Sequence, residues 1–250
     1  MEQDERYLQK HFMDLSRRAE ERNIVTFSHF LNLNEQNIFH QITKELYSPF
    51  QLSGGYEHAE RQMVAFIPDA LSYVWEYPIA LVRVLPSSPK FAETLTHRDV
   101  LGAVMNLGIK RETLGDILMQ ESGIIVICLS SISGYLMENC RIIRHTMVDC
   151  TEIQAAGFSY QPNLVEKDGI AASMRLDTIV ADLGKMSRSA AQKQIAAGNV
   201  FVNARKILQS DYNCQDGDIL SIRHFGKFQI ETTGQVTKKG RIKYKYKVYA

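Results

Sequence analysis

Long apolar runs are missing from this 250-residue chain, and so is an apolar leader at its start. No stretch reaches the roughly eighteen uninterrupted apolar residues that a membrane-spanning helix requires. The first residues, Met-Glu-Gln-Asp-Glu, are acidic where a secretory signal peptide is basic and then apolar. We therefore expect a globular protein of the cytoplasm that does not engage a membrane.

Cysteine is scarce and widely spaced. Cys128, Cys140, Cys150 and Cys214 form no Cys-x-x-Cys pair and match no histidine spacing, which excludes the usual zinc sites and disulfide frameworks. The P-loop, the Gly-x-Gly-x-x-Gly fingerprint and the HExxH motif are also missing from the sequence. We expect free thiols, no metal and no cofactor.

Titratable residues that suggest a catalytic or metal site gather once, at His97, Arg98, Asp99 and Asp116. No nucleophile motif completes this group. Arg98 and Asp99 also fall at the start of a predicted helix, where a structural role is the better interpretation. We expect no catalytic residues and no enzyme activity.

Charge is distributed unevenly, although the net charge of the whole chain is only +1. Residues 174–250 contain 14 Lys and Arg against 6 Asp and Glu, a balance of +8, whereas residues 1–173 contain 15 against 22, a balance of −7. The basic end suits a polyanion, and the acidic remainder would reduce indiscriminate adhesion to nucleic acid. The sequence thus indicates a nucleic-acid-binding C-terminal segment.

The periodicity of apolar residues predicts an α+β protein of three small domains. A stripe of Leu8, Phe12, Leu15 and Ala19 predicts a helix over residues 3–22. A second helix is expected over residues 34–46, with an Asn cap before Glu35, and strand-like residues follow at 63–67. We expect residues 1–78 to form an N-terminal α/β domain.

Residues 79–159 show a different order of elements. Strands are expected at 80–85, 115–119, 124–129 and 145–153, with helices at 97–107 and 134–142. This β-α-β-β-α-β order is that of a ferredoxin-like domain, a fold shared with RNA-recognition motifs. Residues 124–129 carry no aromatic ring on which a base could stack, so we expect the sheet to be structural. Residues 160–173 lack periodicity and are expected to be a linker.

The last segment, residues 174–250, has the pattern of a two-helix module on a small sheet. Leu176, Ile179, Val180 and Leu183 form one apolar stripe, and Gly184 ends that helix. Ser187 or Ser189 caps a second helix, Ser189 with Gln192 in capping-box register, and Gly198 ends that helix. Strands are expected at 200–203, 219–222, 225–230 and 244–249, the last two joined by a basic turn at 237–241. Lysine and tyrosine alternate over residues 243–247, so this strand should present a lysine face and a tyrosine face, and we expect its tyrosines to pack rather than to stack on bases.

Basic residues fall near the helix starts and turns of this module, where they could share one face. Cations near helix N-termini oppose the helix dipole by about 0.3–1 kcal/mol, so stability alone does not explain them, whereas a phosphate would. The candidate RNA-binding residues are Arg175, Lys185, Ser187, Arg188, Lys193, Arg205, Lys206, Lys238, Lys239 and Arg241.

The module closely resembles the RNA-binding domain first described in ribosomal protein S-four. The matching pieces occur in the family's order: Arg175-Leu-Asp, Ser187-Arg188, Ile195 with Gly198, Val200-x-Val-Asn203 with Lys206, and Gly217-Asp-x-Ile. The resemblance implies an S-four-like fold whose two-helix face binds structured RNA through its backbone and shape.

A second resemblance spans nearly the whole chain. Gly54-Gly-Tyr-Glu-His-Ala-Glu-Arg61 and His97-Arg-Asp-Val-Leu-Gly-x4-Leu-Gly-Ile-x-Arg111-x3-Gly115-Asp-Ile117 resemble motifs of the bacterial YlmH family. The resemblance implies a non-enzymatic factor that binds rRNA and tRNA on the large ribosomal subunit and supports ribosome-associated quality control of stalled peptidyl-tRNA. It also implies that Arg175 and Arg188 contact RNA. We expect a monomer away from the ribosome.

Two alternatives remain open. S-four-like domains also deliver pseudouridine synthases and methyltransferases to rRNA, and Arg175-Leu-Asp177-Thr is similar to the motif that carries the catalytic aspartate of pseudouridine synthases. Gly is missing before Arg175, however, and Asp177 belongs to the first helix of the module. A cell-division scaffold is the second alternative, and it rests on the usual gene neighbourhood of the family alone.

Overall fold

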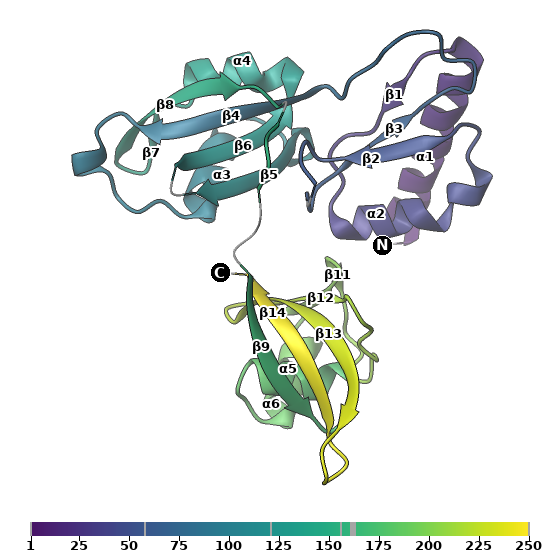
Figure 1. Ribbon diagram of the computed structural model, residues 1–250, viewed down its shortest axis with the longest axis vertical. Helices are drawn as coiled ribbons and strands as arrows, with labels where there is room; N and C mark the ends of the chain where they lie inside the picture. Colours follow the sequence, from purple (N-terminus) through teal and green to yellow (C-terminus); the bar gives the residue numbers. More distant parts are fainter. Residues whose placement is uncertain (1, 58, 121, 156, 161–163, 250) are drawn as a thin grey trace. The chain divides into compact units, whose positions relative to one another are not determined.

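The computed structural model describes residues 2–57, 59–120, 122–155, 157–160 and 164–249, and describes no side chains for Glu2, Phe91 and Tyr249. The chain forms two compact units, residues 1–160 and 161–250 (Figure 1). The sequence predicted two separate domains within the first of these units. Within the described ranges, no helix is long and apolar enough to cross a bilayer.

The first unit begins with two helices on a small sheet. Helix α1 (Glu2–Arg22) and helix α2 (Leu33–Gln41) pack against strands β1 (Thr26–Phe27), β2 (Phe50–Ser53) and β3 (Met63–Phe66), whose order is β1-β3-β2. The predicted stripe of α1 is confirmed, since Phe12, Leu15 and Ala19 are buried. They pack in one cluster with Phe39 of α2 and Phe66 of β3.

Helix α2 is shorter than the predicted 34–46. Asn32 is its cap: the Asn32 side chain accepts from the backbone N–H groups of Asn34 and Glu35, and the Glu35 carboxylate accepts from the Asn32 N–H at 2.7 Å. This capping box begins the helix one residue earlier than expected. A separate 3₁₀ turn, Thr43–Glu45, follows the end of the helix and accounts for the apparent extension.

The rest of the first unit confirms the ferredoxin-like order. Its elements are β4 (Ile79–Pro86), α3 (His97–Asn106), β5 (Leu114–Gln120), β6 (Gly123–Leu129), α4 (Ser130–Asn139), β7 (Ile142–Ile143) and β8 (Thr146–Ile153), with 3₁₀ turns at Pro89–Phe91 and Arg111–Thr113. The strands form an antiparallel sheet in the order β5-β6-β4-β8-β7. Helix α4 begins at Ser130 rather than at the predicted Gly134.

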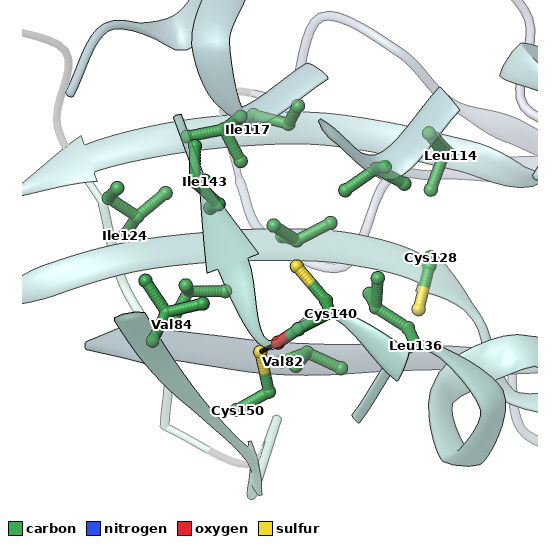
Figure 2. Close-up of a cluster of buried hydrophobic side chains, with 14 of the residues drawn as sticks. Val82, Val84, Leu114, Ile117, Ile124, Cys128, Leu136, Cys140, Ile143 and Cys150 are labelled. Atoms are coloured by element: carbon green, nitrogen blue, oxygen red, sulfur yellow. Dashed lines mark hydrogen bonds between the residues drawn. The ribbon is translucent and has the colours of Figure 1, made fainter. Parts of the chain in front are cut away.

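One face of this five-stranded sheet is buried under helices, and the other is buried over β5, β6 and the start of β4 but exposed along most of β8. On one face, Val82, Val126 and Cys128 pack against α3 and α4, whose Val100 and Leu136 belong to the same cluster (Figure 2). All four cysteines are buried, reduced thiols, as predicted. The Cys150 thiol donates to the Cys140 carbonyl at 3.3 Å.

The other face of the sheet explains why the first unit is not divided at residue 78. Leu81, Ile125 and Ile127 point to this face and pack against Phe30 and Met63 from the N-terminal part. Since two adjacent parts share one core, the predicted boundary between residues 1–78 and 79–159 does not separate compact units. The same packing confirms that the sheet is structural on this face.

The second unit is a six-stranded sheet with two helices. Its elements are β9 (Leu164–Ala171), α5 (Leu176–Leu183), α6 (Arg188–Ala196), β10 (Val200–Val202), β11 (Arg205–Lys206), β12 (Ile219–Ile222), β13 (Gly226–Val236) and β14 (Ile242–Tyr249). The strand order is β11-β10-β12-β13-β14-β9. Both predicted helices are confirmed within one residue, and the predicted stripe Leu176, Ile179, Val180 and Leu183 lies in the core.

The expectation of a linker at residues 160–173 is wrong for its central part. Residues 164–171 form β9, which pairs with β14 along its whole length. Because β9 is an edge strand, its attachment depends on backbone hydrogen bonds more than on buried side chains. Only Gly169 and Ala171 of this strand are buried, which explains the lack of periodicity. The residues at 161–163 lie outside the described part of the chain.

Strand β14 separates its tyrosines from its lysines, as predicted. Tyr244 is buried, Tyr246 packs against the same core, and the Tyr244 hydroxyl donates to Asp182 at 2.6 Å. Gly169 of β9 makes room for this ring, since a Cβ atom there would lie 2.3 Å from Cζ of Tyr244. The preferred interpretation, that these tyrosines pack rather than stack on bases, is confirmed for both.

Candidate nucleic-acid interface

A buried carboxylate, Asp177, is the centre of the candidate site. It lies in the first turn of α5 with a side chain that is 0% exposed. Its oxygens accept hydrogen bonds from Arg175 Nε at 3.3 Å, Arg188 Nε at 3.0 Å and Gln192 Nε2 at 3.0 Å. Two of the predicted RNA-binding arginines are therefore held by one anion.

The backbone fixes the position of each arginine. Arg175 is the N-cap of α5 and forms an isolated β-bridge with Asn213, and the next N–H, of Leu176, donates to the Tyr212 carbonyl at 2.7 Å. Arg188 is the first residue of α6. Ser187 caps that helix by accepting from the Ala190 N–H at 3.2 Å. Ser187 thus has a local structural role as well as its place in the predicted set.

The electrostatics of this cluster keep Asp177 ionised. Burial alone would raise its pKa, but hydrogen bonds from Arg175, Gln192 and Arg188 outweigh burial and hold the pKa well below its usual range. The same hydrogen bond raises the pKa of Arg175. Two guanidinium groups and one carboxylate leave a local charge of one positive unit.

The two arginines retain donors for a ligand. A guanidinium carries five N–H donors, and each of these arginines directs only two nitrogens at Asp177. Their side chains are 40% and 57% exposed, respectively. The remaining donors form a fork that suits the oxygens of a phosphate group. We name Arg175, Asp177, Arg188 and Gln192 the arginine cluster.

The other predicted residues lie around the two helices and are exposed. Lys185 lies between α5 and α6 in the left-handed region, with a φ of 48°. Lys193 is on α6, and Arg205 and Lys206 form β11. The Lys206 side chain lies over Gly198 at the end of α6, where a Cβ atom would be 3.2 Å from its Cδ. Among the described residues, no hydrogen bond or ion pair links these four side chains to Arg175, Asp177, Arg188 or Gln192.

The basic turn between β13 and β14 is a separate feature. Lys238, Lys239 and Arg241 lie in this turn, whose backbone is closed by the Thr237 N–H donating to the Arg241 carbonyl at 2.7 Å. In Figure 1 the turn projects from the end of the sheet opposite β11. Among the described residues, no carboxylate lies within 4.0 Å of these three cations. We name them the hairpin tip.

The outward lysines of β14 are, by contrast, largely neutralised. Lys245 pairs with Glu166 of β9 at 2.6 Å, and Lys247 pairs with Glu231 of β13 at 3.5 Å. Such paired lysines attract a polyanion less than unpaired ones do. They provide an internal control for the arginine cluster and the hairpin tip.

Sequence reasoning identified the arginines of the cluster but not the groups that organise them. The sequence pattern places Asp177 in the first helix of the module and pairs Gln192 with Ser189 as a possible cap of the second helix. In the structure Ser187 is the cap, and Gln192 binds Asp177 instead. One signal was available: Arg188 and Gln192 are four residues apart and so share a helix face.

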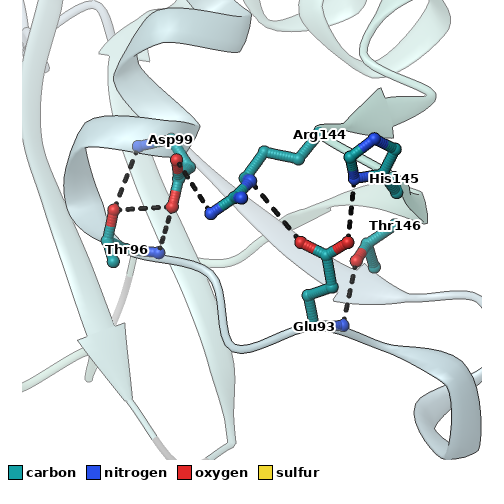
Figure 3. Close-up of polar contacts among 6 residues, drawn as sticks. All are labelled: Glu93, Thr96, Asp99, Arg144, His145 and Thr146. Atoms are coloured by element: carbon teal, nitrogen blue, oxygen red, sulfur yellow. Dashed lines mark hydrogen bonds and ion pairs between the residues drawn. The ribbon is translucent and has the colours of Figure 1, made fainter.

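The titratable group in the middle of the chain does not form one site. Asp116 accepts from the Tyr56 hydroxyl at 2.8 Å and the Glu60 N–H at 2.7 Å, so it fixes the loop that carries the first YlmH-like motif. Asp99 instead closes a capping box with Thr96 and pairs with Arg144 (Figure 3). No group of three or more His, Cys, Asp or Glu among the described residues could hold a metal ion.

An exposed pair of guanidinium groups at the starts of two helices, on a unit with a surplus of basic residues, defines a protein that binds nucleic acid. Comparison with known families agrees. Residues 174–220 match the S4 domain, and residues 74–157 match a family described as "Putative RNA-binding domain in YlmH". The chain thus carries a segment that matches the YlmH RNA-binding domain, followed by a segment that matches the S4 domain.

Two similar proteins extend this assignment. A Bacillus subtilis (strain 168) protein named ribosome-associated protein quality control protein P2 is 28% identical over 242 residues, which cover 95% of this chain and 93% of the relative. The solved structure of cell division protein ylmH from Streptococcus pneumoniae aligns with a TM-score of 0.52 at 22% identity, over 63% of this chain and 95% of that one. The second likeness shows a shared fold.

Proposed function

We propose that this protein is a non-enzymatic factor that binds structured rRNA and tRNA on the large ribosomal subunit, in quality control of stalled peptidyl-tRNA complexes. The observation that carries the proposal is the arginine cluster, in which a buried anion holds two exposed guanidinium groups at helix starts. The name of the Bacillus subtilis relative supports the ribosomal setting.

The cluster suits recognition of the RNA backbone. Double-stranded RNA is recognised mainly through its shape, phosphates and 2′-hydroxyls, because its major groove is too narrow for side chains to read. Guanidinium groups in a fixed orientation bind phosphate in two-point geometry and contribute position more than sequence preference. The predicted residues Lys185, Lys193, Arg205 and Lys206 would add contacts around this centre.

The arrangement of Asp177 favours binding over catalysis. In the competing hypothesis, an RNA-modifying enzyme, this aspartate would attack or deprotonate a substrate. It is instead fully buried and engaged by two arginines, a glutamine and the hydroxyl of Thr178. A carboxylate with so many donors is a poor nucleophile and a poor base.

Sucrose-gradient sedimentation of cell extracts tests the proposal. The wild type should migrate with large subunits at low and moderate salt, and the Arg175→Ala, Arg188→Ala double variant should shift to the top of the gradient. The matched control is Lys245→Ala with Lys247→Ala, which removes two cations that already have acidic partners. Wild-type protein that stays at the top at both salt concentrations would refute ribosome association.

A further inference from the structure

The central strands of the five-stranded sheet in the first unit cannot stack bases as RNA-recognition motifs do. Those motifs stack bases on an open sheet face. Over β5, β6 and the start of β4, one face packs against α3 and α4, and the other packs against Phe30 and Met63. RNA can therefore reach this domain at the exposed face of β8, at the sheet edges or on its helical side.

The helical side carries a pocket of about 590 Å³ that runs along α3 and reaches the C-terminal end of α4. Its volume is within the range of about 300–1,000 Å³ that is usual for small-ligand sites. We name it the α3–α4 pocket. Its lining residues are Arg98, Asp99, Gly102, Ala103, Asn106, Leu107, Asn139, Cys140, Ile142 and Arg144.

The polar lining favours an anionic ligand with hydrogen-bonding edges. Asp99 accepts from Thr96 and pairs with Arg144 at 3.8 Å, and Arg144 also pairs with Glu93. Arg98 is the lining cation for which the described residues show no ion pair. Figure 3 shows Arg144 between Asp99 and Glu93, the latter at 3.4 Å. Arg144 is held in the left-handed region with a φ of 56°, which is uncommon outside glycine and asparagine.

Two asparagine side chains of the pocket can form hydrogen bonds with a base. Asn106 and Asn139 stand at the ends of the two helices and line the pocket. Asn139 uses its Nδ2 to donate to the Tyr135 carbonyl at 2.8 Å, which orients its Oδ1 as an acceptor. An amide can donate to and accept from the edge of a nucleobase. The apolar side chains of Leu107 and Ile142 offer a surface for the base plane.

Gly102 is the second observation that points to a ligand. It lies inside α3, where glycine is less favourable than almost any other residue. A Cβ atom at Gly102 would meet no atom within 4 Å, so packing within the protein does not require glycine there. Its lack of a side chain leaves the floor of the pocket open.

We propose that the α3–α4 pocket binds one unpaired nucleotide of RNA. Arg98 binds its phosphate, and Asn106 and Asn139 bind the edge of its base. The inference rests on the proposed RNA-binding function, and it assigns the first unit an RNA contact separate from the arginine cluster.

Photo-crosslinking of the full chain to a short single-stranded RNA that contains 4-thiouridine tests this site, with the crosslinked peptides mapped by mass spectrometry. Crosslinks are expected in residues 97–107 and 139–144. Gly102→Gln should abolish them, because the new side chain fills the pocket. Arg98→Ala should lower their yield about tenfold, as expected for the loss of one charge-assisted hydrogen bond.

Gly134→Gln is the matched control. Gly134 is also inside a helix, a Cβ atom there would also meet no atom within 4 Å, and it does not line the pocket. Equal loss of crosslinks in both glycine variants would overturn the proposal. So would preferential labelling by free 4-thiouridine monophosphate, which would make the site one for free nucleotides.

The outcomes separate this inference from the proposed function. Crosslinks confined to residues 161–250 would overturn the pocket assignment and leave RNA binding by the second unit intact. Crosslinks to neither unit, together with no binding of ribosomal RNA, would overturn both.

Discussion

At the scale of single residues, Asp177 has the clearest role. It is a buried anion that accepts from Arg175, Arg188 and Gln192, so we expect it to affect RNA binding by orienting the arginines and not by direct contact. Its pKa lies below the unfolded value of about 3.9. The stabilisation by its charge is therefore complete above about pH 4 and is lost as the pH falls through the depressed pKa.

Asp177→Asn should destabilise the protein by about 1–3 kcal/mol at pH 7. The reason is that a buried amide oxygen is a weaker acceptor than a carboxylate for the hydrogen bonds that Arg175 and Arg188 donate. In urea unfolding, the difference in free energy of unfolding between the variant and the wild type should shrink as the pH is lowered from 5 to 3. Over this range the carboxylate becomes protonated in the unfolded chain, where its pKa is about 3.9. A difference that does not vary with pH would show that the charge of Asp177 is not what stabilises the fold.

The same variant separates orientation from charge in RNA binding. Removing an anion should tighten binding if net charge alone matters, whereas loss of arginine orientation should weaken it. Asp211→Asn is the control. Asp211 is exposed, and its substitution removes one negative charge near Arg175, as Asp177→Asn does. We expect weaker binding for Asp177→Asn and equal or tighter binding for Asp211→Asn in fluorescence anisotropy.

At the scale of elements, the β13–β14 hairpin extends the module beyond its recognised part. The match to the S4 domain ends at residue 220, before β13 begins at Gly226. Strand β9 lies on the far side of β14, so the two flanking segments complete one sheet. The three cations at the tip of this hairpin are exposed, and we predict that they contact RNA separately from the two helices.

Replacing Lys238, Lys239 and Arg241 by alanine should reduce RNA affinity without loss of stability. Exposed substitutions usually change stability by less than about 0.5 kcal/mol. Each lost phosphate contact should reduce the slope of log affinity against log salt by about 0.7–0.9. Salt titrations of RNA binding measure this slope, and thermal unfolding monitors stability. An unchanged slope would exclude the hairpin tip from the interface.

At the scale of the whole molecule, the two units carry opposite charge. Residues 1–160 contain 14 Lys and Arg against 20 Asp and Glu, a balance of −6, and residues 161–250 contain 15 against 8, a balance of +7. The acidic unit lowers the attraction of the chain to any polyanion, irrespective of how the units are arranged. Selectivity for RNA would then depend on specific contacts more than on net charge.

A fragment of residues 161–250 tests this idea, since it is a compact unit with its own core. We expect it to bind an unrelated structured RNA more tightly than the full chain does at low salt. The difference should vanish near 1 M salt, where the screening length falls to about 3 Å. Filter-binding assays at both salt concentrations measure it, and equal affinities at low salt would show that the first unit does not repel RNA.

Local patterns in the sequence determined much of this protein. The stripes of α1 and α5, the two-helix module, the ferredoxin-like order and the charged halves all follow from residues close together in the chain, because helix and strand periodicity is a local property. The arginines of the site could be selected for the same reason, from their places at helix starts.

The tertiary structure alone decided the rest. It joined the first two predicted domains through Phe30 and Met63, placed β9 beside β14, and gathered Arg175, Arg188 and Gln192 on Asp177. Each of these features depends on contacts between segments that are distant in sequence or on backbone hydrogen bonds of an edge strand. Such contacts leave no periodic signal, so their partners become known only when the chain is folded.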